Sequence, residues 1–225
     1  MFRFTTSRLA LAIASLVVAG PALAANVSFS GFTHGSETVT ATLTGPNVPL
    51  PAKNVSAGGF STVLNGGPSF EAYCVDLYQT INFGAPPYPE YSLPETTHVF
   101  TNANAYTDLG RLYATAGVVN TAIEEAAFQI AVWEIAYEAT GTPYNLSSGA
   151  ATFTGGTAAS SGALTLASTW LLNLSTNPHP NISVLDSPLH QDVIFAPVPE
   201  PSTVLLMAAG MLGLGFVSAR RRAQL

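Results

Sequence analysis

The feature that most constrains the fold is a helix-forming run in the middle of the chain, AIEEAAFQIAVWEIAYEAT, which begins at Ala122. Thr121 and Glu124 open it as a capping box, in which the threonine hydroxyl accepts from the amide three residues on and the glutamate reaches back. Gly141 and Pro143 end it. Apolar residues surround most of the helix, so other elements have to bury it on nearly every side.

The segments around this run read mainly as strands. Alternation of apolar and polar residues, bounded by turn residues, predicts strands over 26–32, 36–45, 60–64, 70–77, 78–83, 181–186 and 191–198. Helical spacing of apolar residues predicts two further helices, at about 104–116 and 164–173. The sequence therefore predicts an α+β domain, mainly antiparallel β and sandwich-like or barrel-like, with an inserted helical subdomain.

Three segments lack these patterns. Residues 46–69 are rich in Pro, Gly, Ser and Asn and predict a loop that contains the short strand at 60–64. The Pro-rich stretch 84–95 cannot form a central strand or a helix interior, so it predicts a surface crossing. The Gly/Ser/Thr-rich segment 145–165 predicts a flexible loop or an edge hairpin.

The first 24 residues have the pattern of a secretory signal peptide. Arg3 and Arg8 form a positive region, Leu9–Val18 is apolar, and Ala22 and Ala24 form a small-residue cleavage site. The alternative, a retained membrane anchor, is disfavoured because the apolar run is too short to span a bilayer comfortably. We expect cleavage after Ala24 and one globular domain over 25–197, since the chain of 225 residues is short for two.

The last residues, 198–225, form a three-part tail. Residues 203–219 are uncharged and apolar, at the lower limit of length for a transmembrane helix, and Arg220, Arg221 and Arg222 follow them. Positive residues stay on the cytoplasmic side, which leaves the domain outside. The motif Val198-Pro199-Glu200-Pro201-Ser202 precedes the helix.

This tail resembles the PEP-CTERM sorting signal. The resemblance implies processing near Pro199-Glu200-Pro201 by exosortase, a membrane transpeptidase of Gram-negative bacteria that make extracellular polysaccharide. It also implies anchoring in the inner membrane during transit, followed by release to the cell surface or extracellular matrix. The alternative is an ordinary C-terminal anchor in which the Pro-Glu-Pro motif is accidental.

The domain between the two ends is strongly acidic. Five of the seven basic residues lie in the ends, which leaves Lys53 and Arg111, whereas only Glu200 of the 13 acidic residues lies in the tail. The resulting net charge of about −10 disfavours nucleic acid and anionic membrane surfaces as partners and favours cationic or neutral ligands.

The chain has a single cysteine, Cys74, in the segment EAYCVDLYQT. In an exported protein this leaves an intermolecular disulfide, a free thiol, a buried apolar residue or a thiol engaged in other covalent chemistry. A cysteine hydrolase needs a nearby histidine, and the chain's histidines lie in no recognisable motif: His34, His98, His179 and His190.

The central helix carries one uncharged amide, Gln129, in apolar surroundings. An unpaired buried amide costs on the order of 1 to 3 kcal/mol, so a partner is expected. A hydrogen bond to the backbone, to Tyr73 or to Tyr113 is the simplest candidate.

Together the two segments resemble the thioester domains of bacterial surface adhesins. Tyr73-Cys74-Val75-Asp76 matches the aromatic-Cys-hydrophobic motif, and Phe128-Gln129-Ile130-Ala131-Val132, continued by Trp133 and Glu134, matches the helix motif. The resemblance implies a Cys74–Gln129 side-chain thioester, formed with loss of ammonia, that an amine or hydroxyl on a surface or matrix molecule attacks. Those adhesins are largely Gram-positive and carry a cell-wall sorting signal and stalk domains, which this chain lacks.

The neighbours of the two motifs are expected to form the thioester pocket. The aromatic residues Tyr73, Phe128 and Trp133 would exclude water, and the carboxylates of Asp76 and Glu134 could orient either partner. His98 is a candidate base, although a solvated loop histidine is the simpler interpretation.

We find no metal-ligand spacing, phosphate loop or nucleotide fingerprint, so neither a metal nor a cofactor is expected. The function predicted is covalent attachment by an exported surface or matrix protein that is not an enzyme. The alternatives are a non-covalent structural or carbohydrate-associating matrix protein and, third, a cysteine hydrolase.

Overall fold

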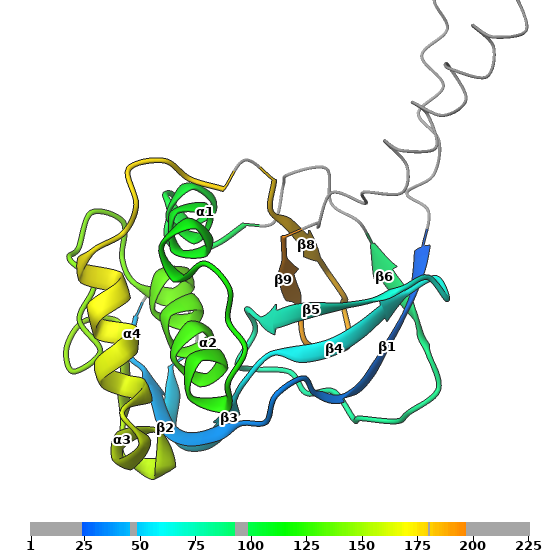
Figure 1. Ribbon diagram of the computed structural model, residues 1–225, viewed down its shortest axis with the longest axis horizontal. Helices are drawn as coiled ribbons and strands as arrows, with labels where there is room; N and C mark the ends of the chain where they lie inside the picture. The colour runs from blue at the N-terminus through cyan, green and yellow to red at the C-terminus, as the bar shows by residue number, and fades with distance from the viewer. Residues whose placement is uncertain (1–23, 46–48, 93–98, 180, 197–225) are drawn as a thin grey trace, which may run out of the picture.

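The computed structural model describes residues 24–45, 49–92, 99–179 and 181–196 (Figure 1). The signal peptide up to residue 23, His98 and the whole predicted tail lie outside these ranges. Within the described ranges no helix combines the length and apolar character needed to cross a membrane. The predicted transmembrane helix, 203–219, belongs to the part that is not described.

The larger sheet has six strands, in the order β6-β1-β4-β5-β9-β8. Each neighbouring pair is antiparallel. The strands are β1 (Ala24–Phe32), β4 (Phe60–Leu64), β5 (Ser69–Cys74), β6 (Tyr88–Ser92), β8 (Ser183–Leu185) and β9 (Val193–Phe195). Strand β5, which ends at the cysteine, is therefore interior to the sheet, between β4 and β9.

A second sheet has three antiparallel strands, in the order β3-β2-β7. They are β2 (Glu37–Leu43), β3 (Leu50–Ala57) and β7 (Ala151–Thr154). The helices are α1 (Ala105–Ala116), α2 (Ala122–Tyr137), α3 (Gly156–Ser161) and α4 (Ala163–Leu172). They gather at one end of the larger sheet, beside the smaller one (Figure 1).

Helix α2 is the centre of this arrangement. It packs against α1 and α4 and also against β3, β5 and β7. All its residues from Glu125 to Ala136 are buried, which is the burial on nearly every side that its composition predicted. Thr121 caps it as expected: the threonine hydroxyl accepts from the Glu124 amide at 3.2 Å.

The mainly antiparallel β class with helices in the middle of the chain is confirmed, and four local expectations are wrong. The strand predicted at 78–83 is absent, because β5 ends at Cys74 and the chain then turns. The segment predicted as a loop over 46–69 contains the edge strand β3. Most of its residues are exposed, so its sequence lacks the alternation of apolar and polar residues that predicts a strand.

The other two errors concern segments read as irregular. The Pro-rich stretch 84–95 contains β6, which lies at the sheet edge, where proline is tolerated. The Gly/Ser/Thr-rich segment 145–165 contains β7, which pairs with β2, and helix α3. In both segments tertiary pairing outweighs weak local propensity.

Candidate functional site

The thiol of Cys74 is buried at the end of β5, where the residue is 1% exposed and free of any disulfide. The backbone pairing of Cys74 with Val193, and a hydrogen bond from Val75 N to Asp192 O, hold the end of the strand. The thiol donates to the carbonyl oxygen of Asp76 at 2.9 Å. Burial raises the pKa of the thiol to about 12, although the side chain of Trp133 and the backbone at Asp76 act to lower it.

The carboxamide of Gln129 lies directly against Cys74. Its Nε2 donates to the carbonyl oxygen of Cys74 and its Oε1 accepts from the amide of the same residue, both at 2.8 Å. Gln129 is 0% exposed. The structure thus brings together the two residues that the sequence singled out, and the expected partner of the amide is the cysteine's own main chain rather than Tyr73 or Tyr113.

The aromatic neighbours are buried but face different ways. The rings of Tyr73 and Phe128 pack on each other, with centroids 4.5 Å apart, and both contact Tyr113. Trp133 stacks on Phe153 at 6.0 Å, and its indole nitrogen has no hydrogen-bond partner among the described residues. All three aromatic residues named with the motifs are therefore buried, and their ring contacts include Tyr113 and Phe153.

The two carboxylates named with the motifs contact backbone groups. The Asp76 side chain accepts from the amide of Tyr78 at 2.8 Å. Glu134 is 0% exposed and accepts from the amide of Asn145 at 2.7 Å, so it holds the chain after α2 rather than Cys74 or Gln129. Burial raises the pKa of the Glu134 carboxyl to about 8.

A small cavity of about 150 Å³ opens beside the cysteine. Val75, Asp76 and Tyr78 line it from the segment after β5, and Ala136 and Tyr137 line it from α2. The hydroxyl of Tyr137, which accepts from the amide of Leu77 at 2.9 Å, bridges these two walls. Sequence analysis did not single out Tyr137, which becomes a site residue only through this bridge.

None of the three described histidines contacts the thiol. Nδ1 of His34 contacts Glu125, Nδ1 of His179 lies 3.0 Å from Asn181 O, and Nδ1 of His190 contacts Glu90. The side-chain hydrogen bond of Cys74 goes to a carbonyl oxygen. A thiol with a raised pKa and no histidine partner among the described residues differs from the thiolate–imidazole pair of a cysteine hydrolase.

A second constellation was missed by the sequence analysis, which expected no metal ligands. His34, Glu71 and Glu125 place one potential ligand atom each within 4.8 Å of one another. These residues are far apart in the chain and follow no ligand spacing. The one signal available in the sequence was Glu125, an acidic residue one helical turn before Gln129 in the buried part of α2.

Comparison with protein families adds evidence on the tail. The model of the PEP-CTERM protein-sorting motif matches residues 197–222. The chain carries a PEP-CTERM sorting signal. The prediction made from Pro199-Glu200-Pro201, the apolar segment and the three arginines is thereby confirmed. This signal implies export, a route through the cell envelope to the surface, and exosortase as the processing partner.

Two further comparisons concern the chain as a whole. Comparison with curated proteins finds no match. Among solved structures, the N-terminal domain of the Streptococcus pyogenes pilus tip adhesin Cpa is similar at 15% identity and a TM-score of 0.46. The similarity covers 80% of this chain and 97% of that one.

Proposed function

We propose that this PEP-CTERM protein attaches covalently to a surface or matrix molecule through a thioester between Cys74 and Gln129. The observation that carries the proposal is the pair of 2.8 Å hydrogen bonds between the Gln129 carboxamide and the main chain of Cys74. Because both polar atoms of the carboxamide contact Cys74, the carbon between them lies against the residue that bears the thiol.

Formation of the bond needs no co-reactant. The sulfur attacks the carboxamide carbon, the thiol proton passes to the amide nitrogen, and ammonia leaves. When an amine of the partner attacks the same carbon, an amide bond to residue 129 forms and the Cys74 thiol is regenerated with the proton of the amine. Each molecule reacts once, so the protein acts as a binder rather than a turnover enzyme.

Burial supports a long-lived thioester. Cys74 is 1% exposed and Gln129 0% exposed, which limits hydrolysis by water. The chain has a single lysine, Lys53, which is exposed on β3. Strand β3 belongs to the smaller sheet, whereas β5, which ends at Cys74, belongs to the larger one. Self-reaction is thereby disfavoured.

We infer that the incoming group enters through the 150 Å³ cavity, which Val75 and Asp76 line directly after Cys74. It lies next to Cys74 along the chain, and its lining includes both Asp76 and Asp192. Carboxylates at this position favour the approach of a cationic amine over an anionic nucleophile. The partner class that fits best is therefore a molecule that presents a primary amine on a slender side chain.

The test is the intact mass of mature protein purified from producing cells. The thioester form is lighter than its sequence by one ammonia, and incubation with methylamine gives an adduct at residue 129 that is heavier than the sequence by one CH2 group. Cys74→Ala and Gln129→Ala abolish the deficit.

Gln191→Ala is the matched control, because the Gln191 amide donates to the same Asp76 carbonyl as the thiol, at 3.3 Å. This variant leaves the mass deficit unchanged. Fresh protein with full mass and a free thiol would overturn the proposal.

A non-covalent matrix protein is the second candidate. Two observations favour it: the thiol donates to Asp76 O, and both polar atoms of the Gln129 side chain already hydrogen-bond backbone groups. In that case Cys74→Ser leaves attachment to cells or matrix intact. Under the covalent proposal the same substitution abolishes attachment that resists denaturant.

A further inference from the structure

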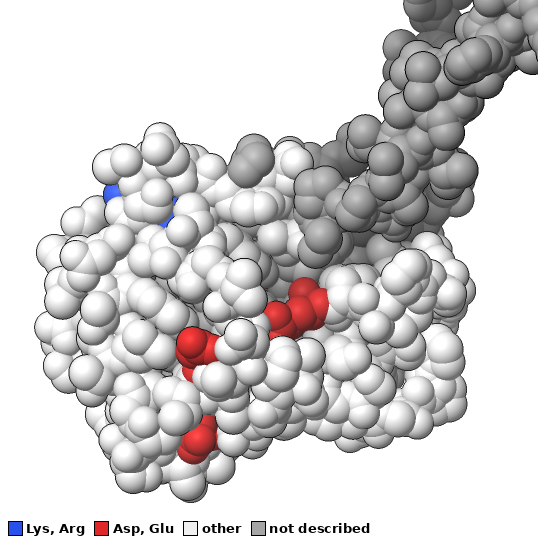
Figure 2. Space-filling model, in the orientation of Figure 1, with Lys and Arg blue, Asp and Glu red and all other residues white. Residues whose placement is uncertain are grey.

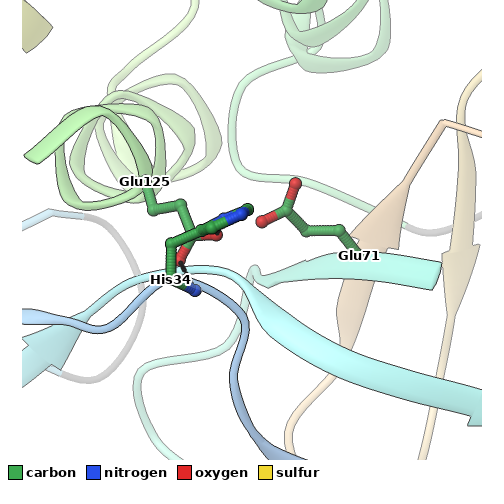
Figure 3. Close-up of side chains that lie close together, drawn as sticks. All are labelled: His34, Glu71 and Glu125. Carbon is green, nitrogen blue, oxygen red and sulfur yellow. Dashed lines mark hydrogen bonds and ion pairs between the residues drawn. The ribbon is translucent and has the colours of Figure 1, made fainter. Parts of the chain in front are cut away.

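Three side chains from separate elements converge beside the N-terminal end of α2. His34 comes from the connection between β1 and β2, Glu71 from β5, and Glu125 from the first turn of α2 (Figure 3). Their potential ligand atoms lie within 4.8 Å of one another. Figure 3 shows the Glu71 carboxylate pointing toward the other two side chains.

Hydrogen bonds from the backbone orient the Glu125 carboxylate, as is common for carboxylates that bind metals. Its Oε2 accepts from the backbone amides of His34 and Gly59, each at 3.2 Å. Its Oε1 faces Nδ1 of His34 at 2.5 Å. Backbone donors thus fix one oxygen of a residue that is 0% exposed and leave the other directed into the cluster.

Two polar atoms at this place are buried without a partner. Oε1 of Glu71 and the hydroxyl of Tyr73, a residue only 2% exposed, make no hydrogen bond with any described residue. Glu71 and Tyr73 line the same cavity, which has a volume of about 770 Å³. Buried polar atoms without a protein partner are rare, and an ordered water or a bound ion is a common explanation for them.

The backbone is also shaped around the Glu71 carboxylate. A Cβ atom at Gly59 would lie 2.3 Å from Oε1 of Glu71 and 2.9 Å from its Cδ. A larger residue at position 59 would therefore push the end of the Glu71 side chain away from its present place in the cluster.

We propose that His34, Glu71 and Glu125 bind a divalent transition-metal cation. One imidazole and two carboxylates form a donor set that suits Zn²⁺ or Mn²⁺. Ligand atoms at about 2.1 Å from a tetrahedral ion lie roughly 3.4 Å apart. His34, whose side chain is 40% exposed, has to move about 1 Å away from Glu125 to reach this spacing, and the Glu71 side chain has to adjust with it.

The surroundings favour a cation. On the face shown in Figure 2, acidic side chains appear at separate places between the middle and the lower edge of the molecule, whereas the basic atoms lie apart from them, near α1. The cavity lined by Glu71 gives the ion a route from solvent.

The experiment is a titration of chelator-treated full-length protein with Zn²⁺, and separately with Mn²⁺, followed by calorimetry and thermal melting. It is done in the Cys74→Ala background, which removes the only thiol as a competing ligand. We expect one ion per chain and a rise in Tm. Glu71→Gln and His34→Gln lower the affinity by at least tenfold, and Gly59→Ala by about 10- to 100-fold through the displaced carboxylate.

Glu90→Gln is the matched control, because Glu90 and His190 form the other described His–Glu contact and have no third ligand. This variant keeps full affinity. Metal-free Glu71→Gln also separates the proposal from misfolding: it melts no lower than the parent, since the amide has the size of the carboxyl group and carries no charge beside Glu125. Absence of saturable binding, or equal binding by all variants, would overturn the proposal.

Discussion

Gln129 hydrogen-bonds both main-chain polar groups of Cys74, the amide and the carbonyl, at 2.8 Å each. The contact joins the buried middle of α2 to the last residue of an interior strand. It therefore fixes the position of α2 relative to the larger sheet, whatever covalent chemistry follows.

The first prediction concerns these hydrogen bonds alone. In the Cys74→Ala background, where no thioester forms, Gln129→Glu removes the donor to the carbonyl of residue 74 and buries a charge. We expect the free energy of unfolding to fall by about 1 to 3 kcal/mol, measured by urea denaturation. An unchanged midpoint would mean that this contact does not help to hold α2 on the sheet.

The second prediction concerns the start of α2. Thr121→Ala removes the hydroxyl that accepts from the Glu124 amide, and should lower the free energy of unfolding by about 1 kcal/mol. Thr121→Ser keeps the acceptor and serves as the control, with stability close to the parent. Equal losses in both variants would point to the threonine methyl group rather than the cap.

The third prediction concerns pH. Burial raises the pKa of Glu134 from 4.5 to about 8, so between these values the native state holds a proton that the unfolded state has lost. The contribution of Glu134 to stability is therefore complete below about pH 4.5 and falls as the pH rises to about 8. Glu134→Gln, which can still accept from the Asn145 amide, should flatten the decline in Tm over this range. A parallel decline in both proteins would contradict the assignment.

The fourth prediction concerns sorting. Replacement of Pro199, Glu200 and Pro201 by alanine, or of the three arginines by glutamine, should leave the protein unprocessed and associated with the membrane fraction. The measurement is the C-terminal mass of the protein recovered from each fraction. Normal processing of both variants would mean that the tail serves only as an anchor.

Local sequence patterns were sufficient to predict those elements that depend only on residues close together in the chain. The alternation in β1 and β2, the capping box of Thr121 and Glu124, and the apolar circumference of α2 each act within a few residues. The same is true of the sorting signal, whose three parts follow one another along the chain. The proximity of Cys74 to Gln129 was also anticipated, through the resemblance of both motifs to one family.

Other features exist only because distant segments meet. Strand β7 forms from a Gly/Ser/Thr-rich segment because β2 offers it backbone partners, and β6 forms at a sheet edge despite its proline. The convergence of His34, Glu71 and Glu125 depends on the packing of α2 beside β5. The sequence by itself thus determined the helix, the sorting tail and the paired motifs. Only the tertiary structure decided the edge strands and the carboxylate cluster, because hydrogen bonds and charges between remote residues leave no local periodicity.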